Sequence, residues 1–471
     1  MRKTMGLLAM IATTTTLLAC SSKNSAPKAP DSDAGAGTTS GLGKVNHVVV
    51  IVLENWTFDS LYAELPGVEG LSHALQAPPQ LDATGTPYAT LPQTETHLPQ
   101  TLPNAPFPLD TYIPTAGFTS TDLTNNFYEE QRQIHGGKMD QFVLFDAAAK
   151  GLTMGYYHTA GLPLRNEAES YTVCDHFFHG VYGGSLQNHI FLISAAVAQF
   201  PDAPASVKKA VLDANGEPVD GANGKPQEGP LTPDGYVVGT LFPAANPHPP
   251  ATPSEQLVPP QSFATIGDRL SAKGLDWAWY AEGWNEIIAG ATLNEAGTDP
   301  STLFQYNHQP FVYFAAYAEG TPGRAHLKDE TDFVAAAKSG SLPAVAFVKP
   351  DGVDNEHPNY ADVIQGDTHA IDLIDAVRNG PNWQDTVIIV TYDEGGGFWD
   401  HVAPSSADRW GPGTRVPTLI VSPFAKKGFV DSTVYDASSI LALIEHRWDL
   451  SALGTRDAAA ADLTAALDLG P

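Results

Sequence analysis

Two pairs of polar side chains follow apolar segments of this sequence and could bind a cation. Asp393 and Glu394 follow the β-branched run Val387–Val390, after Thr391 and Tyr392, and precede three glycines. Glu54 and Asn55 end the apolar run Val45–Leu53. Short apolar runs of this kind are typical of buried strands. Because ligands lie beyond the carboxyl ends of strands in an open α/β sheet, the sequence predicts that the two pairs meet there.

The donor types of these two pairs indicate which cation would bind. Carboxylate and amide oxygens are hard ligands, which suit a divalent cation better than zinc's preferred imidazole and thiolate set. We therefore expect one divalent metal ion and leave its identity open. The alternative is that each acidic residue is a solvated loop start or a helix N-cap. Finding two such pairs after two apolar runs favours the metal.

A serine offers a candidate nucleophile. Ser185 follows Gly183-Gly184 and precedes the apolar segment Ile190–Ala195, so we expect it at the N-terminus of a helix. Unpaired N–H groups and the helix dipole favour an anion at that position. A metal that lowers the pKa of the hydroxyl would make it nucleophilic toward a phosphoryl group. The alternative, which the local sequence alone favours, is that Ser185 only caps the helix.

The elements that must position these residues alternate between strand and helix patterns from residue 267 to residue 448. Strands are expected at 276–280, 344–348, 387–390 and 418–421, and helices at 368–378 and 437–448. This alternation predicts an α/β fold: a doubly wound, mostly parallel sheet with helices on both faces. Long loop excursions are also expected, because the chain has 42 glycines and 38 prolines.

The first twenty residues have the features of an export signal. Arg2 and Lys3 precede an apolar, threonine-rich stretch that is too short to span a bilayer, and residues 17–20 (LLAC) fit a bacterial lipobox. By resemblance to bacterial lipoproteins, cleavage before Cys20 would leave a lipidated N-terminal cysteine. The alternative is an ordinary secretory signal in which Cys20 is incidental, and the protein would then be secreted.

These signals divide the chain into segments and predict a location. We expect a signal peptide at 1–19, a flexible tether at 20–43, one main domain at 44–452 with a proline-rich excursion or cap at 201–262, and a C-terminal tail at 453–471. The lipobox predicts a lipid-anchored protein of the cell envelope. Serine after the lipobox cysteine is similar to the outer-membrane sorting pattern of Gram-negative lipoproteins.

The amino-acid composition limits which kinds of partner the protein can bind. The chain has 53 acidic and 25 basic residues, for a formal net charge of −28. General electrostatics therefore excludes binding to nucleic acid or to an anionic membrane surface. Cys174 is the single cysteine after Cys20, so the mature domain has no intramolecular disulfide available.

Several short motifs carry a family resemblance. Residues 54–59 (ENWTFD) resemble the Glu-Asn-any-Ser/Thr-Phe-Asp opening of a bacterial phosphoesterase family, which contains phosphocholine-preferring phospholipases C and respiratory-burst-inhibiting acid phosphatases. Residues 392–402 (YDEGGGFWDHV) are similar to its second signature, and residues 355–358 (NEHP) and 183–185 (GGS) also fit. The motifs keep the family's order across residues 46–450. Serine in the GGS motif resembles the acid phosphatase branch, because the phospholipase branch tends to carry threonine there.

The resemblance implies an alkaline-phosphatase-like α/β fold and roles for individual residues. Its implied metal ligands are Glu54, Asn55, Asp393 and Glu394. Its implied catalytic residues are Ser185, as nucleophile, with His308 and His357 on the phosphoryl group or its leaving oxygen. Its implied substrate contacts are Asn125, Asn307 and His401.

The chain departs from the family pattern at two places. Relatives often have paired histidines where this chain has Asn307-His308, and a histidine before the Phe-Tyr that here follows Asn125-Asn126. Loss of these imidazoles would lower activity or change its pH range.

The function expected from these observations is metal-dependent hydrolysis of phosphomonoesters through a phosphoseryl intermediate. One alternative is a phospholipase C-type phosphodiesterase that acts on phospholipid head groups. The other is a non-catalytic surface lipoprotein that binds a phosphorylated ligand. The expected partners are accordingly a small phosphorylated substrate or a phospholipid head group, with the membrane reached through the lipid anchor.

Overall fold

The computed structural model describes residues 39–221, 226–291 and 303–470, which belong to one compact unit that begins at Thr39. The predicted signal peptide, Cys20 and most of the predicted tether lie outside the described residues. Leu42 is buried, so the unit begins before the boundary predicted at residue 44. Of the helices that the structure describes, none has both the length and the apolar character needed to cross a membrane.

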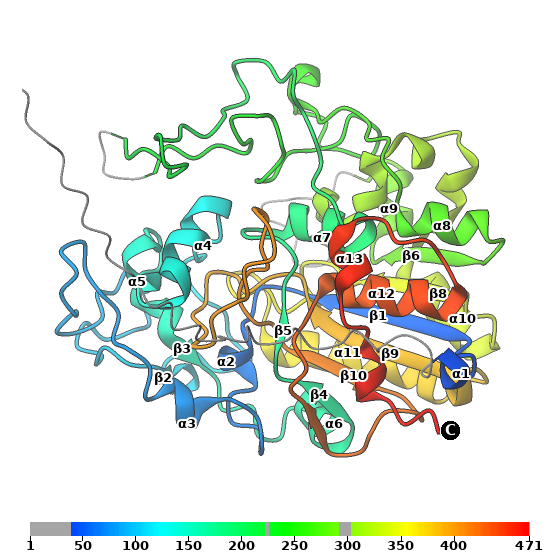
Figure 1. The fold of residues 1–471 in the computed structure, drawn as a ribbon, viewed down its shortest axis with the longest axis horizontal. Helices are drawn as coiled ribbons and strands as arrows, with labels where there is room; N and C mark the ends of the chain where they lie inside the picture. Colours follow the sequence, from blue (N-terminus) through cyan, green and yellow to red (C-terminus); the bar gives the residue numbers. More distant parts are fainter. Residues whose placement is uncertain (1–38, 222–225, 292–302, 471) are drawn as a thin grey trace, which may run out of the picture. The chain divides into compact units, whose positions relative to one another are not determined.

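A mixed sheet lies at the centre of this unit (Figure 1). Its strands, in spatial order, are β11 (Phe429–Asp431), β4 (Thr172–Cys174), β10 (Thr418–Val421), β9 (Thr386–Tyr392), β1 (His47–Leu53), β8 (Val345–Lys349), β6 (Trp277–Ala281) and β7 (Leu327–Asp329). All neighbouring pairs are parallel except those that involve β10. The α/β class and the mostly parallel sheet predicted from the sequence are therefore confirmed.

The register of the central strands decides which residues meet at the edge of the sheet. Leu53 of β1 lies opposite Tyr392 of β9, so Glu54 and Asp393 leave the sheet side by side. Ile51 of β1 lies opposite Val348 of β8, which brings Lys349 to the same edge. Every residue of β8 and β9 is buried, and so is every residue of β1 except the half-buried His47, as their apolar composition predicts.

β10 runs antiparallel to both of its neighbours, β9 and β4, which strand–helix alternation did not predict. A parallel strand needs a crossover connection, usually a helix, whereas an antiparallel strand does not. No helix lies between β9 and β10, so residues 393–417 stay at the carboxyl edge of β9. This connection carries several of the polar residues described below.

Apart from one pair among the shorter helices described below, the helices that contact one another form two groups. The first group contains α1 (Thr39–Leu42), α7 (Ser185–Ser194), α8 (Ile266–Ala272), α12 (Ala437–Trp448) and α13 (Thr455–Ala459). The second contains α6 (Pro163–Ser170), α10 (Glu330–Ser339) and α11 (Val363–Arg378). Figure 1 shows α7 and α12 on one side of β1, with α11 and α6 on the other.

The sheet and the two helix groups form three layers, and shorter elements lie outside them. The remaining helices are α2 (Phe58–Leu61), α3 (Leu71–Ala74), α4 (Phe127–Ile134), α5 (Phe142–Phe145) and α9 (Trp284–Ile288). Two small parallel pairs join β2 (Phe107–Pro108) to β3 (Gly155–Tyr156) and β5 (Phe177–Phe178) to β12 (Tyr435–Asp436).

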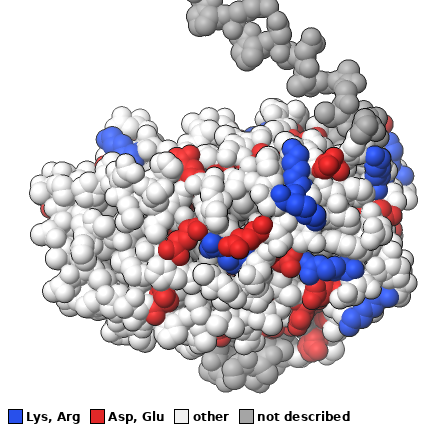
Figure 2. All heavy atoms as spheres, turned by 90° about the horizontal axis from the view of Figure 1, so that it is seen from below, with Lys and Arg blue, Asp and Glu red and all other residues white. Residues whose placement is uncertain are grey.

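The predicted excursion and tail differ in how much regular structure they contain. The described part of residues 201–262 has only one short 3-10 turn, at Ser254–Gln256, besides isolated bridges. The predicted tail at 453–471 packs against the domain, because Leu463 and Ala466 are buried and Leu467 forms a bridge with Ala425. On the face shown in Figure 2, charged side chains are sparse and both signs are present.

Candidate active site

The acidic side chains at the ends of β1 and β9 form a buried group, which we call the carboxylate centre: Glu54, Asp393 and Glu394. Their exposed fractions are 0%, 7% and 1%. The Asp393 amide donates to the Leu53 carbonyl at 3.1 Å, which fixes the two strand ends together. Asn55, the remaining predicted metal ligand, is 1% exposed. The structure thus brings the two predicted pairs to one edge of the sheet.

The glycines after Glu394 allow the two strand ends to approach. A Cβ atom on Gly396 would lie 2.4 Å from the carbonyl oxygen of Asn55. Asn55 itself adopts a positive φ of 66°, a conformation that asparagine tolerates better than most residues. The backbones of the two motifs are therefore in direct contact, and a side chain at residue 396 would separate them.

Ser185 lies at the N-terminus of α7 and faces the carboxylate centre. Gly184 is the N-cap and has no side chain that could make a capping hydrogen bond, and Ser185 is the first residue of the helix. Its Oγ donates to Glu54 Oε2 at 3.3 Å. The alternative, in which Ser185 only caps the helix, is therefore not what the structure shows.

A buried glutamate holds the turn before Ser185. The Gly183 amide donates to Glu130 Oε2 at 2.5 Å, and the Asn188 side-chain amide donates to the Gly183 and Gly184 carbonyls at 3.0 and 3.1 Å. Gly183 has a φ of 83°, and a Cβ atom there would lie 2.6 Å from the Phe127 amide nitrogen. Glu130, from α4, also pairs with His179 Nε2 at 2.8 Å.

Three histidines surround the same carboxylates. His308 Nε2 lies 3.3 Å from Glu54 Oε1, and its ring stacks on His189 with a centroid distance of 4.8 Å. His357 Nε2 accepts from the Asn55 side-chain amide at 2.8 Å. His189 Nδ1 lies 2.7 Å from the Ser185 carbonyl, which only accepts, so Nδ1 carries the hydrogen and Nε2 is free as a ligand.

Burial keeps these imidazoles neutral. It lowers the pKa of His189 and of His357 to about 3, and the charge of Lys349 adds to the effect. The pKa of His308 falls well below its ordinary value for the same two reasons. The rings therefore act as neutral hydrogen-bonding groups at neutral pH.

The pKa values of the carboxylates are shifted in the opposite direction, upward. Burial raises the pKa of Asp393 and of Glu394 well above the usual range, and the negative neighbours raise both further. Burial also raises the pKa of Glu54, although the ammonium of Lys349 opposes the shift. Lys349 Nζ lies 2.8 Å from Glu54 Oε1. One ammonium thus pairs with one of the three buried carboxylates.

The residues of the carboxylate centre fit a metal ion. Asn55 Oδ1 and Asp393 Oδ2 are buried oxygen atoms without a hydrogen-bond partner, which is costly unless a ligand occupies them. Donor atoms of Glu54, His189 and Asp393 lie within 4.8 Å of one another. Glu394 lies outside this group and accepts from Asn125 and Gly396. With His189 as a donor, the site suits metals that accept imidazole as well as those that prefer oxygen.

The predicted substrate contacts lie in different surroundings. The Asn125 side-chain amide donates to Glu394 Oε1 at 2.5 Å, so Asn125 is attached to the carboxylate centre. Asn307 is half-buried in a 3-10 turn, Tyr306–His308, next to His308. His401 lies in a separate group, where its Nδ1 pairs with Asp59 Oδ2 at 2.7 Å.

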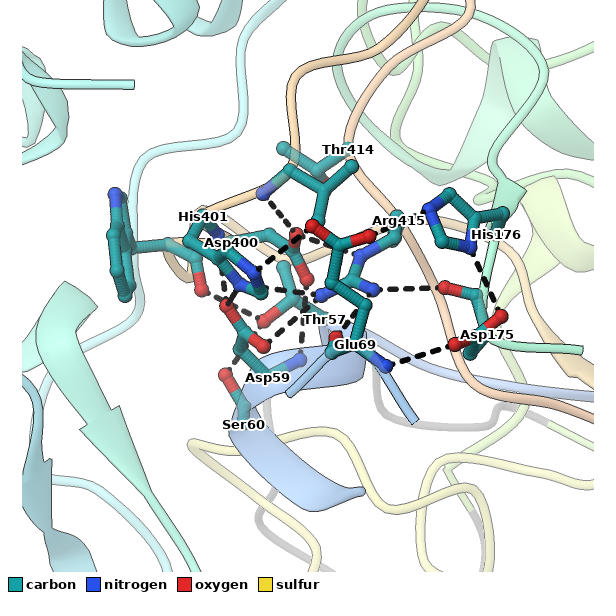
Figure 3. A network of polar contacts seen from close by, with 12 residues as sticks. Thr57, Asp59, Ser60, Glu69, Asp175, His176, Asp400, His401, Thr414 and Arg415 are labelled. Carbon is teal, nitrogen blue, oxygen red and sulfur yellow. Dashed lines mark hydrogen bonds and ion pairs between the residues drawn. The ribbon is translucent and has the colours of Figure 1, made fainter. Parts of the chain in front are cut away.

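That separate group, shown in Figure 3, is called the Arg415 network: Asp59, Asp400, His401 and Arg415. The fully buried Arg415 guanidinium donates to Asp400 at 2.8 Å and to Asp59 at 3.0 Å. Its remaining Nη1 donates to the carbonyls of Glu69 and Asp175, both at 2.8 Å. The network comes from the same two motifs as the carboxylate centre, but here an arginine pairs with both carboxylates.

Reasoning from the sequence alone assigned no role to His189, Lys349 or Glu130. His189 lies four residues after Ser185 on α7, a spacing that puts both on one helix face. Lys349 is the last residue of β8, where functional side chains of an open sheet gather. Both signals were therefore present in the sequence. Glu130 had no such signal, because only the tertiary structure brings α4 beneath the turn.

Comparisons with known proteins identify a family and several similar chains. The sequence pattern of the Phosphoesterase family matches residues 45–451. Phospholipase C A of Mycobacterium tuberculosis is 26% identical over 92% of this chain and 79% of its own length. Non-hemolytic phospholipase C of Burkholderia pseudomallei is 24% identical over 87% of this chain and 56% of its own length. The solved structure of the phosphonate monoester hydrolase of Agrobacterium radiobacter is 10% identical to this chain, with a TM-score of 0.34. The match covers 90% of this chain and 78% of the hydrolase chain.

Proposed function

Because the chain belongs to the phosphoesterase family and is a hydrolase of phosphoric esters, we propose that it hydrolyses phosphomonoesters, as an acid phosphatase does, through a phosphoseryl intermediate. One observation carries this proposal. The Ser185 hydroxyl lies at a helix N-terminus and 3.3 Å from Glu54, within a group of buried carboxylates and imidazoles. Few arrangements other than nucleophilic catalysis would use a serine in that position.

The bond changes assigned to the first half-reaction are as follows. Ser185 Oγ attacks phosphorus, the bond from phosphorus to the ester oxygen breaks, and the serine proton leaves toward Glu54, its acceptor in the structure. The departing alkoxide takes a proton from His308 or His357. A bound phosphoryl group is negative and raises the pKa of both rings, so that one ring takes up a proton from solvent when the substrate binds and can then act as the acid.

The second half-reaction returns the enzyme to its starting state. Water attacks the phosphoserine and gives a proton to the imidazole that lost one. The serine oxygen leaves phosphorus and regains its proton from Glu54. A divalent metal ion held by Glu54, Asn55, Asp393 and His189, with the Glu394 carboxylate beside them, would neutralise the phosphoryl oxygens and lower the pKa of the serine hydroxyl.

A second candidate function is hydrolysis of phospholipid head groups. It is favoured by relatives that bear the name phospholipase C and align with most of this chain. The serine of residues 183–185 supports the phosphomonoester substrate, because it resembles the acid phosphatase branch. The two candidates use the same nucleophile and differ in the leaving group.

One experiment separates the two candidates. We would measure hydrolysis of p-nitrophenyl phosphate and of p-nitrophenyl phosphorylcholine by the full chain, with and without chelator, beside Ser185→Ala. Chelator-sensitive release from the monoester that Ser185→Ala abolishes is the expected result. Preference for the choline ester would assign the phospholipase function, and full activity of Ser185→Ala would overturn the serine mechanism.

The N-terminal sequence supports a further part of the proposal, namely that the enzyme is lipid-anchored in the cell envelope. Residues 17–20 (LLAC) carry this inference. In a bacterial host, wild-type protein should fractionate with membranes and Cys20→Ser with the soluble fraction. Equal membrane association of both proteins would contradict the anchor.

A further inference from the structure

Glu356 is a buried residue of the turn that carries His357, and the reaction steps given above assign it no role. Its exposed fraction is 0%, and its Oε1 is a buried oxygen without a hydrogen-bond partner. Its backbone has a positive φ of 73°, which is uncommon for residues other than glycine. Both features cost free energy, and such features persist mainly at functional sites. Glu356 is therefore a candidate for a role beyond packing.

A glycine of α11 provides the space for the Glu356 side chain. A Cβ atom on Gly366 would lie 2.4 Å from Glu356 Cγ and 2.8 Å from the Glu356 amide nitrogen. Within a helix, glycine is less favourable than alanine. Because any larger residue at this position of α11 would displace the turn, the helix and the turn are fitted to each other.

The carboxylate of Glu356 reaches across the end of β1. In the sheet, β1 lies between β8, which precedes the turn, and β9, which ends at Tyr392. The Tyr392 hydroxyl donates to Glu356 Oε2 at 2.6 Å. Tyr392 is 4% exposed, so both partners of this hydrogen bond are shielded from solvent. The Glu356 side chain thus joins the loop after β8 to the last residue of β9.

The backbone of the same turn is attached to the residues that follow β1. The Glu54 amide donates to the Asn355 carbonyl at 2.9 Å, and the Trp56 indole donates to the Glu356 carbonyl at 2.9 Å. Together with the Tyr392 hydroxyl, these donors hold the turn against both strand ends that form the carboxylate centre.

His357 extends from this turn toward the candidate active site. Its Nε2 accepts from the Asn55 side-chain amide at 2.8 Å, and its ring stacks on Tyr360 with a centroid distance of 4.1 Å. The His357 amide donates to Asn355 Oδ1 at 3.0 Å. These contacts orient the ring within the turn. The position of the turn relative to β9 depends on Glu356, the residue before the ring.

We propose that Glu356 positions His357: by accepting from Tyr392 across the end of β1, its carboxylate fixes the turn so that the imidazole faces the leaving oxygen of the substrate. This inference rests on the function proposed above, in which an imidazole protonates that oxygen. Glu356 does not touch the substrate and acts through the turn that it anchors. Small displacements of a proton donor are enough to slow the transfer.

Three substitutions separate the hydrogen bond from the volume and backbone conformation of Glu356. Tyr392→Phe removes the donor. Glu356→Met removes the acceptor and keeps a side chain of similar length, whereas Glu356→Gln keeps an acceptor oxygen. The matched control is Tyr435→Phe, because the Tyr435 hydroxyl donates to Asp431 Oδ2 at 2.9 Å and both residues are buried. Asp431 belongs to β11, an edge strand of the sheet.

Two measurements are made on each full-length protein. The first is kcat/KM for p-nitrophenyl phosphate and for glycerol phosphate, with the enzyme concentration corrected for the folded fraction by circular dichroism. The second is the NMR resonance of the His357 ring in protein labelled with ¹³C-histidine, assigned with His357→Gln. Nitrophenolate leaves without a proton, whereas the glycerol alkoxide must be protonated as it leaves, so only the second substrate needs the acid.

The expected result is a loss that depends on the leaving group. In Tyr392→Phe and Glu356→Met, kcat/KM for glycerol phosphate should fall by about 10–100-fold, and that for p-nitrophenyl phosphate by less than about threefold. The His357 resonance should shift in both variants. In Glu356→Gln and Tyr435→Phe, the ratio between the two substrates and the His357 resonance should match those of wild type.

Several outcomes would overturn the proposal. One is an equal loss on both substrates, and another is an unchanged His357 resonance in folded Tyr392→Phe. Failure of Tyr392→Phe to fold beside a folded Tyr435→Phe would also overturn it, because the hydrogen bond would then be structural. If only Glu356→Met fails to fold, Tyr392→Phe decides by itself, since it removes a single oxygen atom.

These measurements keep the two proposals distinct. If wild type hydrolyses neither phosphomonoester, the proposed function fails, and the His357 resonance in Tyr392→Phe still decides whether the hydrogen bond positions the ring. If both esters are hydrolysed and the resonance does not move, the proposed function stands and the role of Glu356 fails.

Discussion

The carboxylate centre and the Arg415 network are built from the same two sequence motifs, yet their carboxylates differ in how completely they are paired with a cation. Residues 54–59 supply Glu54 to one and Asp59 to the other, and residues 393–401 do the same with Asp393 and Asp400. The guanidinium of Arg415 pairs with both carboxylates of its network. In the carboxylate centre, the one ammonium pairs with Glu54, and Asp393 Oδ2 has no hydrogen-bond partner. The carboxylates of the centre are thus available for a ligand, whereas those of the network are paired with Arg415, although His401 Nε2 there also lacks a hydrogen-bond partner.

The stacking of Trp56 on Phe398 shows why both groups occur together. These rings, one from each motif, have centroids 4.4 Å apart, and the Thr57 hydroxyl donates to the Trp399 carbonyl at 3.0 Å. The Arg415 network therefore lies where the two loops are packed and fixes their relative position. We infer that the saturated network provides the rigidity that the unsaturated centre lacks.

The largest expected effect comes from the carboxylate centre. Asp393→Asn should lower kcat by about a thousandfold or more, because the metal loses a charged ligand. The free energy of unfolding of the metal-free protein should stay the same or rise, since one repelling carboxylate is gone. Steady-state kinetics and chemical denaturation measure the two quantities. A large loss of metal-free stability would show that the centre is structural, as the network is.

The matching change in the Arg415 network should have the reverse effect. Arg415→Met leaves Asp59 and Asp400 buried without their cation, so the free energy of unfolding should fall by about 3–5 kcal/mol. Affinity of the folded protein for metal should be unchanged. The control is Lys273→Met, which removes an exposed pair with Asp449 and should cost at most about 1 kcal/mol. If both variants lose equal stability, the network has no special role.

Glu130→Gln tests whether the turn before Ser185 depends on a charged acceptor. The neutral amide oxygen still accepts from Gly183, but the pair with His179 is lost, so the turn shifts slightly. We expect kcat to fall by about 10–100-fold with little change in KM, because small displacements of a nucleophile are costly. Equal changes in both parameters would indicate general damage to the fold, as would a matching loss in thermal stability.

The smallest expected effect is a change with pH in the stabilisation that added metal provides, and we expect it at the carboxylate centre alone. Burial raises the pKa of Asp393 and Glu394. The metal-free protein is therefore most stable at acid pH, where both groups are protonated, and it loses this contribution as pH rises through the raised pKa values. Metal must displace their protons. The rise in Tm on adding metal should therefore increase from about pH 5 to pH 8. Asp393→Asn should flatten this dependence, and an unchanged slope in that variant would contradict the assignment.

Much of the fold was readable in the sequence because buried parallel strands have a strong composition signal. The predicted strand at 418–421 and helix at 437–448 have the same bounds in β10 and α12. The direction of β10 could not be predicted, because it depends on a long connection that contains no helix. The packed C-terminal segment was also missed, since short buried contacts such as those of Leu463 leave no periodic pattern.

The candidate site can likewise be divided into features that the sequence predicted and features that it did not. The sequence by itself determined the two acidic pairs, the Gly-Gly-Ser turn and the membership of a family, because each depends on neighbouring residues. Only the tertiary structure decided which polar groups are saturated: Arg415 reaches Asp59 from a distant part of the chain, and Lys349 and His189 reach Glu54. Pairing between buried charges acts through space over a few ångströms, and the spacing of residues along the chain does not specify it.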